Sequence, residues 1–130
     1  MDDRELLDRA AEAAERSYSP YSKFRVGAVV VTDDGDVVSG ANIENAAFGA
    51  SICAEANAIS NAIAAGATAI EAIAVVCLDG DLCTPCGNCR QIMREFNVQR
   101  ILLRTSTGAT QVLSVEDLLP MSFGPEALES

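Results

Sequence analysis

The chain has 130 residues, of which 49% are hydrophobic and 5% aromatic, and its formal net charge is −10 at pH 7. This length predicts a single domain over residues 1–130, with a core large enough to need no disulfide. Nine Lys and Arg stand against nineteen Asp and Glu. Such a balance argues against a nucleic-acid polymer or an anionic membrane as partner, and it favours a small neutral ligand.

The N-terminal stretch "MDDRELLDRAAEAAERSY" is acidic and amphipathic, the opposite of a signal peptide. Nowhere does an apolar run approach the roughly 18 residues that a membrane span requires. We therefore expect a cytoplasmic protein whose thiols stay reduced. The odd count of five cysteines also argues against a disulfide framework.

The first third of the chain predicts a helix followed by a β-hairpin. Residues 2–17 place apolar side chains on one helical face, and Pro20 prevents the helix from continuing. The Val-rich residues 24–32 predict a strand. A turn containing Gly35 leads into its hairpin partner, residues 36–44.

Helices and strands alternate along the rest of the chain. The expected elements are a helix over 53–65 ended by Gly66, a strand over 70–78, a helix over 86–96, a strand over 99–105, a turn over 106–109, a short strand over 110–114 and a short helix over 115–120. The strand over 70–78 is almost continuously apolar, as in a central strand buried on both faces. This order predicts an α/β fold: a three-layer α/β/α sandwich with a mixed sheet of roughly five strands.

Two cysteine clusters stand where a loop leads into a helix: Cys53 in "SICAEANAIS", and Cys83, Cys86 and Cys89 in "CTPCGNCR". A helix N-terminus favours the thiolate, which is the form that binds metal. Cys86 and Cys89 are three residues apart, so they share one side of their helix, and Cys53 would complete a set of three. Three thiolates leave the fourth tetrahedral position of zinc open, as in a catalytic site.

Glu55 lies two residues after Cys53, in the first turn of its helix. A carboxylate there can exchange protons with a metal-bound water without binding the metal. The chain contains no histidine, so a carboxylate is the most available acid–base group. Taken by itself, Glu55 has a plainer interpretation as a carboxylate that interacts with the helix dipole.

The cysteines also allow other interpretations. Cys83, Cys86 and Cys89 could hold an iron–sulfur cluster, or a Cys-x-x-Cys pair could be redox-active. The fourth cysteine of the common iron–sulfur run is missing, however, and Pro85 precedes Cys86 instead of following the last cysteine. Cys77 lies in an apolar strand and is expected to be a small buried hydrophobe, and Cys83 is expected to be a loop residue that binds no metal.

Taken together, "CAE" and the later "PCGNC" resemble the signature of the zinc-dependent cytidine deaminases. The segments "PYSKFRVGA", "GANIENAAFG" and "EDLLPMSFG" resemble motifs of the small homotetrameric branch of that family, so the similarity extends over residues 5–124. The resemblance implies zinc bound by Cys53, Cys86 and Cys89, with Glu55 as the proton shuttle. It implies hydrolytic deamination of cytidine or deoxycytidine in pyrimidine salvage.

The resemblance also implies a nucleoside-binding site shared between subunits of a homotetramer. In it, Asn42 and Glu44 would hydrogen-bond the ribose hydroxyls, and Phe24 would line the pyrimidine pocket. Backbone groups near Ala54 and Cys86 would recognise the edge of the base, and Phe123 of another subunit would stack on it. Considered one at a time, the two Phe residues are more commonly core residues, and a loop Asn commonly serves a turn.

The chain departs from the family at Ala56, because Arg is usual directly after the catalytic Glu, and at Phe48, where Tyr is common. Zinc with three thiolates carries a net charge of about −1, which a neighbouring Arg would offset. Our hypothesis gives this role to Arg90, directly after Cys89. The departure leaves open an alternative function, deamination of N4-substituted cytosine nucleosides or of a nucleoside antibiotic such as blasticidin S. A deaminase fold kept only as a binding module is disfavoured because Glu55 is retained.

Overall fold

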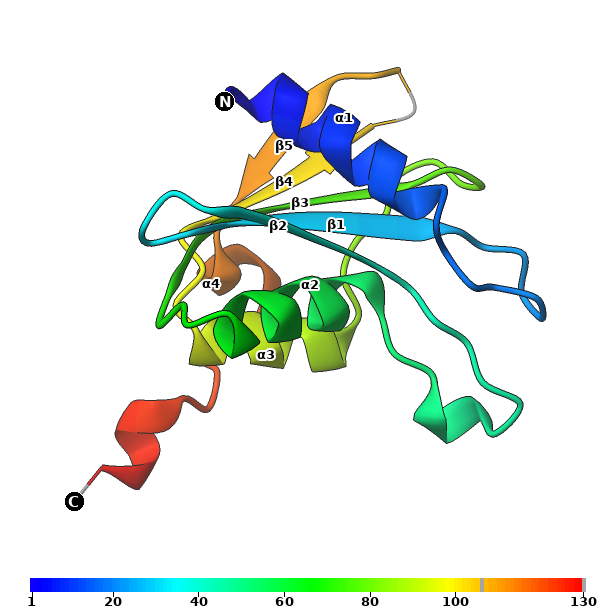
Figure 1. Cartoon of the computed structure of the whole chain (residues 1–130). Helices are drawn as coiled ribbons and strands as arrows, with labels where there is room; N and C mark the ends of the chain where they lie inside the picture. The colour runs from blue at the N-terminus through cyan, green and yellow to red at the C-terminus, as the bar shows by residue number, and fades with distance from the viewer. Residues whose placement is uncertain (106, 130) are drawn as a thin grey trace.

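A computed structural model describes residues 1–105 and 107–129 (Figure 1). Its elements are α1 (Asp3–Ala14), β1 (Val26–Thr32), β2 (Val37–Ala41), the 3-10 helix η1 (Phe48–Ala50), α2 (Ala54–Ala64), β3 (Ile70–Cys77), α3 (Gly87–Glu95), β4 (Arg100–Arg104), β5 (Thr110–Leu113), α4 (Val115–Leu118) and the 3-10 helix η2 (Pro125–Leu128). The turn expected over 106–109 includes Ser106, which lies outside the described residues.

The five strands form one mixed sheet in the order β2-β1-β3-β4-β5. Strands β3 and β4 are parallel, and the other neighbouring pairs are antiparallel. β3 lies at the centre, and seven of its eight residues are buried, Glu71 being the exception. The parallel β3–β4 pair requires a crossover, which α3 supplies. The predicted mixed, five-stranded sheet with an apolar central strand is therefore confirmed.

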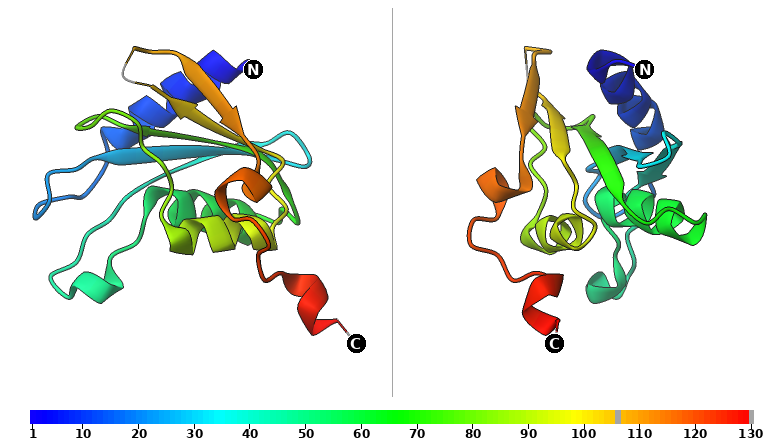
Figure 2. Two further views of the ribbon diagram at one scale, coloured as in Figure 1. Left: turned by 180° about the vertical axis from the view of Figure 1, so that it is seen from behind. Right: turned by 90° about the vertical axis from the view of Figure 1, so that its left-hand side faces the viewer.

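Helices cover both faces of this sheet, as expected. In the right-hand view of Figure 2, α1 lies on one side of the strands, and α2 and α3 lie on the other. Leu6, Leu7 and Ala10 of α1 pack on one face of the sheet. On the other face, Ile59 of α2 and Met93 of α3 belong to a second and larger core cluster. The predicted three-layer α/β/α arrangement is therefore confirmed, with the apolar stripe of each helix turned to the sheet.

Two glycines allow helices to approach the sheet closely. A Cβ on Gly27 of β1 would lie 2.0 Å from the carbonyl oxygen of Ala10 in α1. A Cβ on Gly40 of β2 would lie 2.5 Å from the backbone nitrogen of Ala58 in α2. Both distances are far shorter than any van der Waals contact. Gly40 therefore sets how closely α2, the helix that follows Cys53, packs on β2.

The helices are short, and α1, with 12 residues, is the longest of those described. Asp2 caps its start with a side chain that accepts a hydrogen bond from the Glu5 N–H (2.8 Å), and the helix ends at Ala14, three residues earlier than expected. Within residues 1–105 and 107–129, no helix has the length and apolar character needed to cross a membrane.

The hairpin strands are also shorter than expected. β1 begins at Val26 instead of residue 24, and the N–H of Arg25 just before it donates to Asp79 Oδ2 (2.8 Å). β2 ends at Ala41 instead of residue 44. Beyond it, Ile43 forms isolated bridges to two other loop segments. The chain around residues 42–44 is thus released from the sheet and is free to line a site.

Candidate active site

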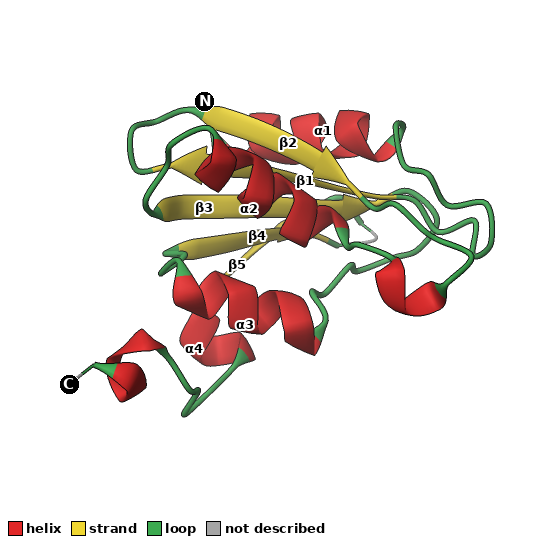
Figure 3. Ribbon diagram, turned by 60° about the horizontal axis from the view of Figure 1, so that its bottom comes forward, coloured by secondary structure: helices red, strands yellow, loops and turns green. Residues whose placement is uncertain are grey.

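Three thiols meet at the N-terminal ends of α2 and α3, which lie on the same face of the sheet (Figure 3). The Sγ atoms of Cys53, Cys86 and Cys89 all lie within 4.8 Å of one another. Cys53 is the residue that caps α2, Cys86 caps α3, and Cys89 lies in the first turn of α3. The N–H of Cys89 points to Cys86 Sγ (3.5 Å). The helix starts expected from the sequence therefore do bring these three side chains together.

This cluster fits a zinc ion. Zn–S bonds of about 2.3 Å in a tetrahedral site imply sulfur atoms about 3.8 Å apart. The Sγ atoms of Cys53 and Cys86 are 3.8 Å apart. Burial raises the pKa of Cys53 and of Cys89. Burial acts in the same direction on Cys86, but hydrogen bonds from the Cys89 N–H and from the neighbouring thiols outweigh it and leave the pKa of Cys86 lowered.

The two other cysteines lie outside the set of three. Among the described residues, the cluster of possible metal ligands does not include Cys83. Cys83 is half-buried, and its burial raises the pKa of its thiol. Cys77 is buried in β3, as expected of a small apolar residue. The geometry therefore gives no support to an iron–sulfur site built from Cys83, Cys86 and Cys89.

Glu55 is the acidic side chain of this region. It lies in the first turn of α2 and is only 5% exposed, although carboxylates are rarely buried. Among the described residues no Lys or Arg forms an ion pair with it. Burial raises the pKa of Glu55, and a contact with Cys89 opposes the shift. A buried carboxyl group of this kind, next to a cluster of thiols that could hold a metal, is suited to exchanging protons.

A pocket of about 490 Å³ opens beside Cys53. This volume is in the range of small-molecule sites. Its lining consists of Tyr21, Ser22, Asn42, Ile43, Glu44, Phe48, Ser51, Ile52 and Cys53. The pocket therefore joins one of the three clustered thiols to Asn42 and Glu44, the two residues expected to bind ribose.

The side chains of Asn42 and Glu44 are held in place by loop residues. Asn42 Oδ1 accepts a hydrogen bond from the N–H of Val26 (2.9 Å), and its Nδ2 donates to the carbonyl of Phe24 (2.8 Å). Among residues 1–105 and 107–129 the second N–H of that amide has no acceptor, so it can donate to a ligand. Glu44 accepts hydrogen bonds from the N–H groups of Tyr21 (3.0 Å) and Ser22 (3.1 Å) and from the Ser22 hydroxyl. The Ser22 hydroxyl lowers the pKa of Glu44, which keeps the carboxylate ionised.

The remaining predicted substrate residues are placed differently. Ala54 is fully buried as the first residue of α2, directly between Cys53 and Glu55. Phe24 is 36% exposed and lies next to the pocket without lining it. Phe123 is 61% exposed on the C-terminal tail. In Figure 1 this tail leaves the domain near the C-terminal ends of α2 and α3, whereas the thiols lie at the N-terminal ends.

Arg90 makes its hydrogen bonds to backbone carbonyls and not to a sulfur atom. Its Nε donates to the carbonyl of Pro85 and its Nη1 to that of Leu118, both at 2.8 Å. The side chain therefore connects the residue that precedes Cys86 to the end of α4. Ala56, at the position where the resemblance leads us to expect Arg, is half-buried in α2.

Sequence reasoning did not single out several residues of the pocket wall. Tyr21 and Ser22 lie within the "PYSKF" segment, and the hydroxyl of Ser22 offered a signal, since it follows a turn-forming proline. The sequence around Ile43 and Ile52 offered no comparable signal. They face each other through an isolated antiparallel bridge between loops, and such a pairing leaves no periodic pattern.

Fold and site together define an α/β metal-dependent hydrolase, with an open three-thiol zinc site next to a buried carboxyl group. Residues 1–105 match the family model described as the cytidine and deoxycytidylate deaminase zinc-binding region, and the chain belongs to this family. It is 41% identical over 128 residues to the cytidine deaminase of Halalkalibacterium halodurans, covering 97% of each chain.

Two further relatives agree with this assignment. The chain is 37% identical over 123 residues to the cytidine deaminase of Mycobacterium tuberculosis, covering 95% of this chain and 90% of the relative. The crystal structure of the cytidine deaminase from Burkholderia pseudomallei superposes with a TM-score of 0.88 at 42% identity. That match covers 95% of this chain and 100% of the other. The expected family and fold are therefore confirmed.

Proposed function

We propose that this protein is a zinc-dependent cytidine deaminase, which hydrolyses cytidine and deoxycytidine to uridine and deoxyuridine with release of ammonia. One observation carries the proposal: Cys53, which belongs to the three-thiol cluster and lies two residues before the buried Glu55, lines a pocket together with Asn42 and Glu44. The relatives from Halalkalibacterium halodurans and Mycobacterium tuberculosis are both named cytidine deaminase. They do not favour the alternative of an N4-substituted nucleoside or a nucleoside antibiotic.

In this proposal Cys53, Cys86 and Cys89 hold the zinc ion. Zinc bound there acts as a Lewis acid that lowers the pKa of water. Glu55 takes one proton from the water whose oxygen adds to C4 of cytosine, and it delivers that proton to N3. Glu55 then carries the second proton of the water to the amino group, which leaves as ammonia when the C4–N bond breaks. Its burial excludes bulk water from both transfers.

The nucleoside is held by residues on the other side of the pocket. Asn42 and Glu44 bind the ribose hydroxyls, with the free N–H of Asn42 as donor and the ionised Glu44 as acceptor. Phe24 lies against the pyrimidine, and backbone groups near Ala54 meet the edge of the base. Phe123 lies exposed on the C-terminal tail, which leaves the domain away from the N-terminal ends of α2 and α3 where the thiols lie. It reaches the site of a neighbouring subunit in a homotetramer.

Arg90 takes over part of the role of the arginine that Ala56 replaces. Its contact with the Pro85 carbonyl fixes the loop that presents Cys86. Its positive charge lies one residue after Cys89 and partly offsets the charge of three thiolates on zinc. We place this enzyme, as one domain over residues 1–130, in the cytoplasm and in pyrimidine salvage.

The test is the loss of cytosine absorbance, with release of ammonia, when zinc-loaded protein is mixed with cytidine. Glu55→Gln should lower kcat by about 10²–10⁴-fold, because it removes the group that carries both protons. Glu116→Gln is the matched control, since Glu116 is an exposed residue of α4, and it should keep wild-type activity. A folded, zinc-loaded wild type that does not turn over cytidine would overturn the proposal. Full activity of Glu55→Gln would overturn the role of Glu55.

A further inference from the structure

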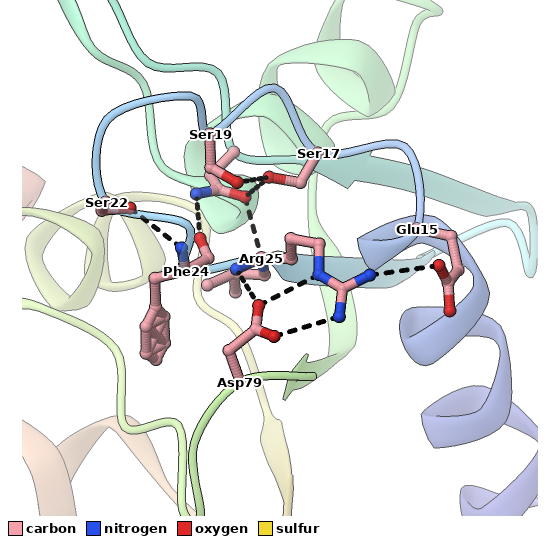
Figure 4. A network of polar contacts seen from close by, with 9 residues as sticks. Glu15, Ser17, Ser19, Ser22, Phe24, Arg25 and Asp79 are labelled. Atoms are coloured by element: carbon pink, nitrogen blue, oxygen red, sulfur yellow. Dashed lines mark hydrogen bonds and ion pairs between the residues drawn. The ribbon is translucent and has the colours of Figure 1, made fainter.

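A compact ion pair joins the start of β1 to the loop after β3. The carboxylate of Asp79 accepts three hydrogen bonds from Arg25: from its backbone N–H (2.8 Å), its Nε (3.0 Å) and its Nη2 (3.0 Å). Figure 4 shows the guanidinium between Asp79 and Glu15. The N–H of Leu78 also donates to the carbonyl of Arg25 (3.0 Å). A two-pronged Arg–carboxylate pair with a further backbone bond fixes both distance and orientation.

On one side, this pair is connected to the polar residues that line the pocket, Ser22, Asn42 and Glu44. Phe24, directly before Arg25, accepts a hydrogen bond at its carbonyl from Asn42 and donates one from its N–H to Ser22 Oγ (3.0 Å). The same Ser22 hydroxyl donates to Glu44. Residues 22–25 therefore connect the pair directly to both residues that we assign to ribose.

On the other side, the pair holds the loop that ends at the metal-binding thiols. Asp79 is the second residue of this loop, which runs from Leu78 to Cys86. The ring of Phe24 packs against it, since a Cβ on Gly80 would lie 3.3 Å from Phe24 Cζ. The ion pair and this ring contact thus both connect residues 22–25, beside the pocket, to the loop over residues 78–86, which leads to the thiols.

The backbone of residues 22–25 depends on contacts with other parts of the chain. Lys23 has a φ of 62°, a left-handed conformation that is disfavoured for residues other than glycine. Such a turn persists only when neighbouring contacts hold it. Before Lys23, the carboxylate of Glu44 accepts hydrogen bonds from the N–H groups of Tyr21 and Ser22. After Lys23, the carboxylate of Asp79 accepts a hydrogen bond from the N–H of Arg25.

We propose that Arg25 and Asp79 are positioning residues: they hold residues 22–25 against the thiol loop, and so determine how tightly a nucleoside is bound beside the metal. This inference rests on the proposed function. The pair lies at the surface, with side chains 40% and 30% exposed, so its contribution to global stability is small. Its loss should therefore be visible in substrate binding before it is visible in the Tm.

The first measurement compares Asp79→Asn and Arg25→Gln with wild type in the zinc-loaded protein. Each variant should raise KM for cytidine by up to roughly fivefold, the size expected for losing an exposed ion pair, while kcat stays within about twofold. Zinc content should not change, because neither residue contacts a thiol. The double variant should raise KM no further than either single variant, since both remove one interaction. Glu15→Gln is the control, as Glu15 contacts the same guanidinium only from the outside, at 3.4 Å, and it should leave KM unchanged.

The second measurement is amide hydrogen exchange of residues 21–25 in the same zinc-loaded proteins. Asp79→Asn should accelerate exchange there and leave α2 protected. Unchanged KM, or a fall in kcat and zinc content without a rise in KM, would overturn the proposal. If wild type does not act on cytidine at all, the proposed function fails separately, and exchange alone decides: accelerated exchange at residues 21–25 supports the positioning role, and unchanged exchange overturns it.

Discussion

Gly40 offers a direct test of how the packing of α2 controls the site. Gly40→Ala adds a Cβ that would lie 2.5 Å from the backbone nitrogen of Ala58 and 3.0 Å from the carbonyl oxygen of Ala54. Both contacts are with the backbone of α2, so no side-chain rotation can relieve them. The helix must move away from β2 by about 0.9 Å to restore the 3.4 Å of an ordinary contact.

This displacement has two consequences that can be measured separately. Overpacking of this kind costs about 1–3 kcal/mol of unfolding free energy. The move also carries Cys53 and Glu55 away from Cys86 and Cys89, because only the first pair travels with α2. A shift of about 1 Å in a catalytic group can cost roughly 10²-fold in rate. We therefore expect a lower Tm, weaker zinc retention, and a loss in kcat/KM of up to roughly 10²-fold.

Gly27→Ala is the matched control. Its Cβ would lie 2.0 Å from the Ala10 carbonyl oxygen, but the clash is with α1 on the opposite face of the sheet. It should lower the Tm while zinc content and kcat/KM, measured well below that Tm, stay near wild type. Thermal unfolding, zinc analysis and the cytidine assay on both variants complete the test. If Gly40→Ala kept full activity, or if both variants lost activity equally, the link between α2 packing and the site would be refuted.

Two further predictions concern metal and pH. Removing the metal with a chelator should lower the Tm by several degrees, and Zn²⁺ but not Mg²⁺ should restore it, because thiolates favour zinc; a Tm indifferent to the metal would contradict the Cys53, Cys86 and Cys89 site. Hydrogen bonding from Arg25 lowers the pKa of Asp79, so the pair stabilises the fold above the unfolded-state pKa of about 3.9 and loses this effect as the pH falls through the lower folded-state value. The Tm difference between wild type and Asp79→Asn should therefore be constant above about pH 5 and shrink below about pH 4; a difference that persists in acid would disprove this.

The sequence alone was sufficient for those features that depend on near neighbours in the chain. The apolar run of β3 and the helical spacing of α1 predicted their burial, and Gly66 ends α2 with a φ of 109°, as expected. The pattern around Cys86 and Cys89 likewise fixed a helix start that presents both thiols on one side. Family motifs, and not periodicity, supplied the roles given to Asn42 and Glu44.

Only the tertiary structure decided what lies next to what across long stretches of chain. Cys53 and Cys86 are 33 positions apart, and their 3.8 Å approach depends on α2 and α3 packing side by side on one face of the sheet. The partnership of Arg25 with Asp79 spans 54 positions and left no trace in local patterns. Hydrophobic period and turn chemistry express preferences of a few neighbouring residues, whereas these contacts arise from strand order and helix packing, which are set by the burial of the whole core.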